Sequence, residues 1–373
     1  MQRYYFDHNA TTPVSPEVLE ALLPMMTEVY GNASSIHHFG QAARQRLDAA
    51  RKQVAGMLGA ELQEIVFTSG GTEADNLAIF GVGGHVVTTT FEHPAVLASA
   101  GQLDHTLVPV DGHGMVDPDA IRRALRPETK VISVMHANNE VGTIQLIAEI
   151  VHIATERGIA VHSDGVQAVG KIPVSVADLG VSLYSLSGHK IGAPKGVGAL
   201  YVRKGIVLKQ MMYGGRHERE RRAGTENVAG AVALGRAAEW ITSNGGAENH
   251  RLASLRDRLE QNILDRIPDT RVNAAGAPRV PNTTNVRFEG IDSDALLIAL
   301  DLKGFAVSSG AACSSGAPEP SHVLLAMGLS RLEARSSIRF SLGRFNTVEQ
   351  VDALVEALVD SVTHLRKLAP SYA

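Results

Sequence analysis

Between residues 64 and 163, short β-prone runs alternate with segments that have helical periodicity. Runs such as Glu64–Ser69, Lys130–Met135 and Ile159–Ser163 are typical of short buried strands. Strands that alternate with helices in this way favour a mostly parallel sheet covered by helices. In such sheets, ligands bind in the loops beyond the carboxyl ends of the strands. We therefore predict an α/β protein whose functional site lies at that edge of the sheet.

Beyond residue 203 the pattern changes to longer helical periods and fewer strands. Two helical patterns, Asn227–Ser243 and Asn249–Arg266, come first. A chain of 373 residues is too long for a single small hydrophobic core. We therefore expect a second, smaller domain. We place the boundary near residue 250. The prediction is a large domain over 15–249 and a small α+β domain made of 1–14 and 250–373.

The composition excludes several classes of protein. The chain is 44% apolar and 20% charged, with a net charge of -4, so it offers no general electrostatic attraction for nucleic acid or an anionic membrane. The N-terminus lacks the order of a secretory signal, and no run of about 18 apolar residues is present. A single cysteine excludes an internal disulfide framework and suggests a reducing cytoplasm.

Lys190 lies in the turn Ser187-Gly188-His189-Lys190, between the β-prone segments Val181–Leu186 and Gly198–Val202. Lysine amines form Schiff bases with pyridoxal phosphate (PLP), and the hydroxyl and imidazole beside Lys190 could hold the phosphate of this cofactor. A solvated surface lysine is the common alternative for an arbitrary lysine.

Two other strand ends carry residues that suit the same cofactor. The run from Phe67 to Glu73 contains two glycines and Thr72 at a predicted helix start, which is a favourable place for an anion. Asp164 follows another strand and could pair with a pyridinium nitrogen, and Gln167 is three residues further on. A simple helix cap is the alternative for both segments.

Three more polar residues are candidates for the site. His93, in a strand-to-helix loop, could stack on a cofactor ring or move protons, although a lone histidine is more often structural. Asn139 follows the strand Lys130–Met135, where turn chemistry is the alternative. Arg339 lies within an apolar, strand-like run and could bind a substrate carboxylate or form a structural ion pair.

Cys313 lies in a segment of Ser, Gly, Ala and Pro, from Val307 to Pro320. A buried and inert thiol is the ordinary alternative for a lone cysteine. Residues of these types cannot build a core around the thiol, so we expect an exposed loop. A thiol in such a loop is a candidate nucleophile.

These motifs, in this order, resemble the cysteine desulfurases of the NifS/IscS type, which are PLP enzymes of aminotransferase fold type I (class V). The resemblance extends over nearly the whole chain. It rests on the segments Phe6–Pro13, Tyr30–Ser35, Phe67–Asn76, Glu92–His93, Met135–Gly142, His162–Lys171, Ser187–Gly198, Arg222–Thr225, Ser308–Val323 and Ser336–Arg344.

The resemblance implies a role for each site residue. Lys190 would hold PLP covalently and then move protons, and His93 would stack over the ring. Asp164 would pair with the ring nitrogen, with Gln167 and Asn139 near the phenolic oxygen. Arg339 would bind the substrate carboxylate. The phosphate would be held by Gly71, Thr72, Ser187 and His189, with Thr225 reaching the phosphate of the partner subunit in a homodimer.

The implied reaction converts L-cysteine to L-alanine. The thiolate of Cys313 would attack the substrate sulfur and keep it as a persulfide, which then passes to a sulfur acceptor or an iron–sulfur scaffold protein. Iron–sulfur cluster assembly and tRNA thiolation both remain open as destinations, as does a transient contact of Cys313 with an iron–sulfur cluster. A selenocysteine lyase or an aminotransferase of the same fold is the alternative function. The chain departs from the usual motifs at His8 and in the residues around Cys313.

Overall fold

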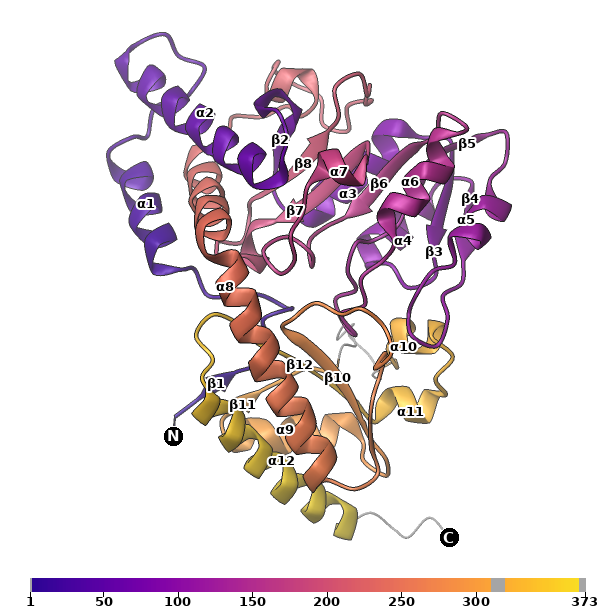
Figure 1. Cartoon of the computed structure of the whole chain (residues 1–373). Helices are drawn as coiled ribbons and strands as arrows, with labels where there is room; N and C mark the ends of the chain where they lie inside the picture. Colours follow the sequence, from indigo (N-terminus) through magenta and orange to yellow (C-terminus); the bar gives the residue numbers. More distant parts are fainter. Residues whose placement is uncertain (1, 310–318, 369–373) are drawn as a thin grey trace.

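The computed structural model describes residues 2–309 and 319–368 (Figure 1). Its main element is a seven-stranded sheet with the strand order β2-β8-β7-β6-β5-β3-β4. All neighbouring pairs are parallel except those of β8, which runs antiparallel to β2 and β7. The predicted α/β fold is confirmed. The strands are β2 (Ile65–Thr68), β3 (His85–Thr89), β4 (His105–Val108), β5 (Thr129–Ser133), β6 (Ala160–Asp164), β7 (Leu183–Ser187) and β8 (Gly198–Val202).

Helices cover both faces of this sheet because alternate strand residues point to opposite sides. Ile65 packs in the core beneath α2, whereas its neighbour Val66 packs against Ala74 and Leu77 of α3 on the other face. The helices of this part are α1 (Pro16–Thr27), α2 (His38–Leu58), α3 (Gly71–Val82), α4 (Pro94–Ala100), α5 (Pro118–Ala124), α6 (Ile147–Thr155) and α7 (Val176–Leu179), with short 3-10 turns η1 (Leu62–Glu64), η2 (Gly188–Lys190) and η3 (Glu218–Glu220).

A second core lies below the large sheet in Figure 1. The antiparallel sheet β12-β10-β9 packs against α9 and α12, and the N-terminal strand β1 pairs with β11 beside it. The elements here are β1 (Tyr4–Tyr5), β9 (Thr270–Val272), β10 (Thr283–Phe288), α9 (Ser293–Leu302), β11 (Phe305–Ala306), α10 (His322–Ala326), α11 (Arg331–Arg335), β12 (Ser337–Ser341) and α12 (Val348–Leu368).

One long helix, α8 (Val228–Arg266), connects the two cores (Figure 1). The sequence pattern predicts two helices here, separated near residue 245, and this prediction is wrong. Leu234 packs in the first core and Leu259 in the second, so packing at both ends outweighs the poor helix propensity of Gly245 and Gly246. The division of the chain into two domains near residue 250 therefore falls inside a helix and stays a prediction. Among the described residues, neither this helix nor any other is long and apolar enough to cross a membrane.

Candidate active site

A cavity of about 370 Å³ lies where the carboxyl ends of the central strands meet the N-terminal segment and β12. All the predicted site residues line this cavity except Thr225 and Cys313. The lining residues are Asn9, Ala10, Gly71, Thr72, Asp75, His93, Met135, Asn139, Asp164, Val166, Gln167, Ser187, His189, Lys190, Ser308 and Arg339.

Lys190 ends the turn η2, which directly follows β7. Its Nζ donates hydrogen bonds to the carbonyl oxygens of Asn9 (2.6 Å) and Ala10 (2.7 Å). Burial, and then the positive charge of Arg339, lower the pKa of Lys190 to about 8. A fraction of this amine is therefore neutral and nucleophilic near neutral pH, as a covalent attachment to an aldehyde requires.

Two buried carboxyl groups lie at one end of the cavity. Asp164, the last residue of β6, accepts a hydrogen bond from the backbone N–H of Val166 at 2.9 Å. Burial raises the pKa of Asp164, and burial together with the Asp164 carboxylate raises the pKa of Asp75 on α3. Within the described residues, the Oδ1 atom of Asp75 has no hydrogen-bond partner. This end of the cavity therefore suits a ligand that brings an N–H group with positive charge.

His93 has a structural contact and also lines the cavity. Its Nδ1 atom accepts a hydrogen bond from the backbone N–H of Ala95 (3.1 Å) and so caps the N-terminus of α4. Burial lowers the pKa of His93, which favours the neutral ring. With Nδ1 as the acceptor, the ring proton is assigned to Nε2. The two interpretations of this histidine, cap and site residue, are therefore compatible.

The part of the cavity at the N-terminus of α3 suits a phosphate. The first backbone N–H groups of α3 lack intrahelical partners, and Gly71, Thr72, Ser187 and His189 surround them. A Cβ at Gly71 would lie 2.9 Å from a methyl carbon of Val166, so only glycine leaves this cradle open. Burial and the charges of Lys190 and Lys195 lower the pKa of His189 to about 4, so its ring is neutral at pH 7. A phosphate cradle, a reactive lysine and buried carboxyls fit PLP.

Arg339, in β12, forms the ion pair that was one of its two predicted alternatives. Its Nη2 donates to a carboxylate oxygen of Asp7 at 2.6 Å, and its Nη1 donates to the backbone oxygen of Asn139 at 3.0 Å. Its Nε is buried and has no hydrogen-bond partner in the described part of the chain. The ion pair thus holds the Arg339 guanidinium at the cavity wall. It leaves some N–H donors of the guanidinium, such as Nε–H, available for a ligand.

Asp7, Asn9 and Lys171 contribute to the site and were not predicted from the sequence as site residues. The side chain of Asn9 donates to the backbone oxygen of Asn139 and to Thr283 Oγ1, and accepts from Lys171 Nζ. Asn9 lies in the N-terminal segment that contributes to the resemblance, but no spacing in the sequence indicates that this segment reaches the central sheet.

Two predicted residues do not line the described cavity. Cys313 lies outside the described residues. On one side of its segment, Ser308 lines the cavity and exchanges backbone hydrogen bonds with Arg339. On the other side, His322 Nε2 contacts the backbone oxygen of Glu92 at 2.9 Å. Thr225 is exposed and lies outside the cavity lining in the described chain. Its predicted contact with a partner subunit stays a prediction.

No group of three or more metal-ligating side chains occurs among the described residues.

The fold and the site together define a PLP-dependent enzyme of aminotransferase fold type I. Comparisons with known proteins support this class of enzyme and show which family within the class the chain belongs to. The chain belongs to the class-V aminotransferase family, whose profile matches residues 4–354. A cysteine desulfurase IscS from Methanosarcina thermophila is 48% identical over 378 residues, covering 98% of this chain and 93% of the relative.

Two solved structures are similar over most of their length. A NifS-like protein from Rickettsia africae superposes with a TM-score of 0.90 at 34% identity, covering 97% of this chain and 100% of the other. A structure described as SspA in complex with cysteine has a TM-score of 0.82 at 34% identity, covering 92% of this chain and 99% of the other. The resemblance stated from the sequence is confirmed.

Proposed function

We propose that this protein is a PLP-dependent cysteine desulfurase, which converts L-cysteine to L-alanine and keeps the sulfur on Cys313. The observation that carries this proposal is that Ser308, five residues before Cys313 in the sequence, lines the cofactor cavity. Beyond the other end of the segment, His322 contacts the backbone oxygen of Glu92, the residue before His93 of the cavity wall. Relatives that are named cysteine desulfurases and a similar protein solved with cysteine support the same function.

In the proposed reaction, the residues of the cavity bind the substrate, move its proton and hold the cofactor. Arg339 binds the carboxylate of L-cysteine, and Lys190 removes the proton from Cα once its amine is free. The neutral ring of His93 offers an Nε2–H donor at the cavity. PLP, when bound, supplies an electron sink that stabilises negative charge on the substrate, with Asp164 at its ring nitrogen and the α3 N-terminus at its phosphate.

The sulfur transfer balances without an added oxidant. The thiolate of Cys313 forms an S–S bond to the substrate sulfur while the substrate C–S bond breaks. The electron pair of that bond stays with the carbon fragment, which takes up a proton and leaves as alanine. Cys313 retains the persulfide, and a thiol of an acceptor protein or a reductant then removes the sulfur.

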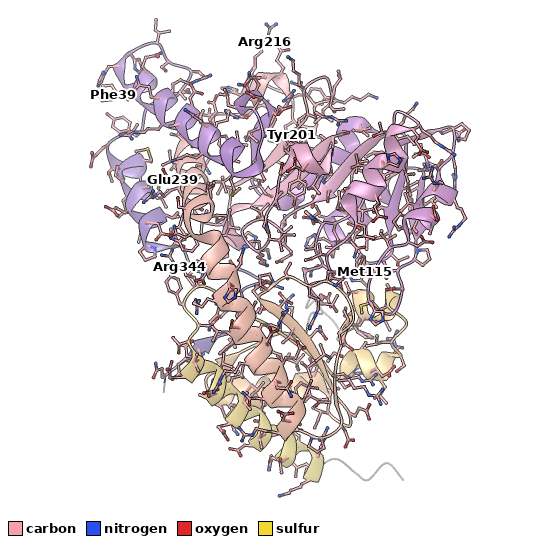
Figure 2. The ribbon with its side chains drawn as sticks, viewed as in Figure 1. Phe39, Met115, Tyr201, Arg216, Glu239 and Arg344 are labelled. Atoms are coloured by element: carbon pink, nitrogen blue, oxygen red, sulfur yellow. The ribbon has the colours of Figure 1, made fainter. Side chains whose placement is uncertain are left out.

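The homodimer is part of this proposal. Exposed apolar side chains occur on α1, in the loop that follows it, at the start of α2 and in the loop before η3. Figure 2 labels Phe39 at the start of α2 and Arg216 in the loop before η3. The exposed apolar residues include Leu23, Met26, Tyr30, Ile36, Phe39, Val207 and Tyr213. An apolar surface of this kind favours association, and a partner subunit would bring its own Thr225 to the phosphate. The Thr225→Val variant is expected to lose PLP faster than wild type. The test measures the rate of PLP loss and, on the same samples, the molar mass in solution.

The destination of the sulfur is a finer part of the proposal. Relatives named IscS favour iron–sulfur cluster assembly over tRNA thiolation, and a single reduced cysteine as carrier favours the cytoplasm. A selenocysteine lyase or aminotransferase is the alternative function. An aminotransferase has no use for the thiol of Cys313, and a selenocysteine lyase would prefer selenocysteine to L-cysteine.

The decisive experiment incubates the purified holoenzyme with L-cysteine and a thiol reductant and quantifies sulfide and alanine. Wild type is expected to give equal amounts of both, and Cys313→Ala and Lys190→Ala are expected to give neither. Because Cys313 is the only cysteine, intact mass after L-cysteine alone should show one added sulfur that is absent from Cys313→Ala. Full sulfide release by Cys313→Ala would contradict the persulfide step, and keto-acid products would favour aminotransferase chemistry.

A further inference from the structure

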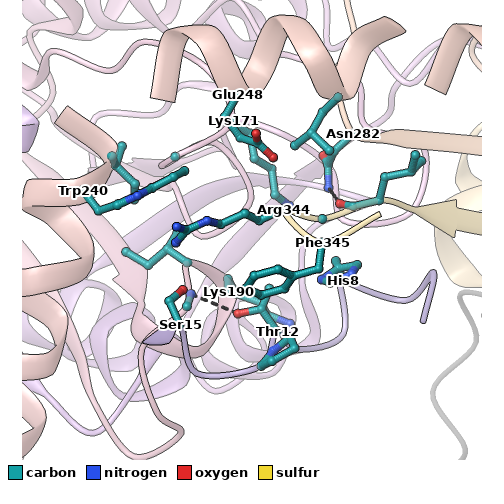
Figure 3. Close-up of a pocket in the computed structure, with 18 of the residues that line it drawn as sticks. His8, Thr12, Ser15, Lys171, Lys190, Trp240, Glu248, Asn282, Arg344 and Phe345 are labelled. Carbon is teal, nitrogen blue, oxygen red and sulfur yellow. Dashed lines mark hydrogen bonds between the residues drawn. The ribbon is translucent and has the colours of Figure 1, made fainter. Parts of the chain in front are cut away.

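Lys171 is a second buried lysine beside the cofactor cavity. It lies in the turn after β6 and is 8% exposed. Its Nζ donates to two side-chain oxygens, Asn9 Oδ1 at 2.8 Å and Gln167 Oε1. Figure 3 shows the far side of Lys171, where it lines a smaller cavity of about 100 Å³ together with Lys190, Trp240 and Arg344.

The hydrogen bonds of Lys171 determine which way the Gln167 carboxamide points. The lysine Nζ donates to the amide oxygen of Gln167, and the backbone oxygen of Asn9 can only accept, so the amide oxygen faces Lys171 and the amide nitrogen faces Asn9. The amide nitrogen then lies on the other side, where one of its two hydrogens is donated to the backbone oxygen of Asn9 at 3.0 Å. Gln167 lines the cofactor cavity, so the polar atom left for a ligand is an N–H donor.

The surroundings of Lys171 argue against a role as a structural ion pair. In the described chain, both hydrogen-bond partners of Nζ are neutral amide oxygens. Burial lowers the pKa of Lys171 well below its usual value, and the charges of Lys190 and Arg339 lower it further. The carboxylate of Glu248, which lines the smaller cavity, is bound by Arg251. Because this buried lysine has no carboxylate partner among its hydrogen bonds, its contribution lies in the N–H donors that it supplies to Asn9 and Gln167.

We propose that Lys171 is a positioning residue: it fixes the Gln167 carboxamide so that Gln167 donates a hydrogen bond to the anionic ring oxygen of PLP. This inference rests on the proposed attachment of PLP to Lys190. It assigns to Lys171 a function through Gln167, and no contact with the substrate. Without Lys171, the carboxamide oxygen loses its donor and the hydrogen bond to the backbone oxygen of Asn9 is left to orient the amide. The amide then turns more readily and presents its oxygen, which repels an anionic ring oxygen.

The test is the pH titration of the visible absorption band of the holoenzyme, measured without L-cysteine. A donor to the ring oxygen stabilises the deprotonated form of the bound cofactor, so losing the donor raises the pH midpoint of the band. Lys171→Met and Gln167→Ala are each expected to raise that midpoint by about one pH unit, the size of one hydrogen bond to a charged group. The double variant is expected to match Gln167→Ala alone, because the lysine acts through the glutamine.

Two further variants separate positioning from a general loss of stability. Lys303→Met, at a partly buried lysine in the second core, is expected to leave the midpoint unchanged. Lys171→Gln keeps an N–H donor without the charge and is expected to shift the midpoint by less than half as much as Lys171→Met. An unchanged midpoint in Lys171→Met, or additive shifts in the double variant, would overturn the proposal. Because no L-cysteine is present, this result is separate from any failure of the desulfurase assay.

Discussion

The carboxyl edge of the large sheet and the N-terminal segment Asp7–Ala10 form facing walls of one cavity, but they are built differently. The sheet edge supplies residues that each follow a strand or open a helix, such as Asp164 and Lys190. The N-terminal segment contains no strand at these residues, and it is held by contacts to both cores: Asp7 to Arg339, and Asn9 to Thr283 and Lys171.

The difference between the two walls lies in what each contributes. Groups with their own reactivity come from the sheet edge, where the backbone is fixed by hydrogen-bonded neighbours on both sides. The N-terminal segment contributes acceptors and donors that hold those groups in place, including the two carbonyl oxygens that bind Lys190. Changes at the sheet edge should therefore abolish chemistry, whereas changes in the N-terminal segment should weaken positioning and stability.

The largest expected effect is at the sheet edge. Lys190→Ala removes the amine that is proposed to hold PLP and to move the Cα proton, so desulfurase activity should fall by at least about 10³-fold. The measurement is sulfide released per enzyme, with PLP in excess. The matched control is Lys195→Ala, an exposed lysine in the same turn, which should stay within a factor of about two of wild type. Equal losses in both variants would remove the distinction between Lys190 and its surroundings.

Asn9→Ala is expected to act on stability more than on chemistry. It removes four side-chain hydrogen bonds and leaves buried partners such as Lys171 Nζ with fewer acceptors. The free energy of unfolding should fall by about 2–3 kcal/mol, measured by denaturant titration of the holoenzyme. Asn244→Ala, at an exposed position of α8, is the control and should change it by less than about 0.5 kcal/mol. A stable Asn9→Ala protein would show that the N-terminal wall does not need this side chain.

Asp7→Asn should affect substrate binding to a smaller extent. The carboxylate of Asp7 fixes the Arg339 guanidinium at 2.6 Å, and without this charge the arginine samples more positions. KM for L-cysteine should rise about tenfold, or about 1.4 kcal/mol, with kcat less affected. Asp352→Asn is the control, because it breaks an exposed ion pair between Asp352 of α12 and Arg258 of α8. This variant is expected to leave KM unchanged. A pure loss of kcat in Asp7→Asn would place Asp7 in the chemical step instead.

The smallest effect concerns pH. With its pKa lowered to about 8, the neutral fraction of Lys190 should grow about fivefold between pH 7 and pH 8 and level off above pH 9. The rate of PLP attachment to the apoprotein, followed by visible absorbance, should show the same profile. An amine with the usual pKa of about 10.4 would instead give a rate that keeps rising through pH 9. That outcome would mean that the burial of Lys190 does not activate it.

The amino-acid sequence alone determined the α/β class, the edge of the sheet that holds the site, and most residues of the sheet-edge wall. It could do so because most of these residues end or closely follow a strand or open a helix, and local periodicity reports both. The continuity of α8 across Gly245 and Gly246 was decided by packing in two cores. The tertiary structure alone brought Asn9 to the cavity and placed Asp7 and Lys171 against the lining residues Arg339 and Gln167. Asn9 and Lys171 are 162 residues apart, and no local pattern reports a contact between segments so distant in the chain.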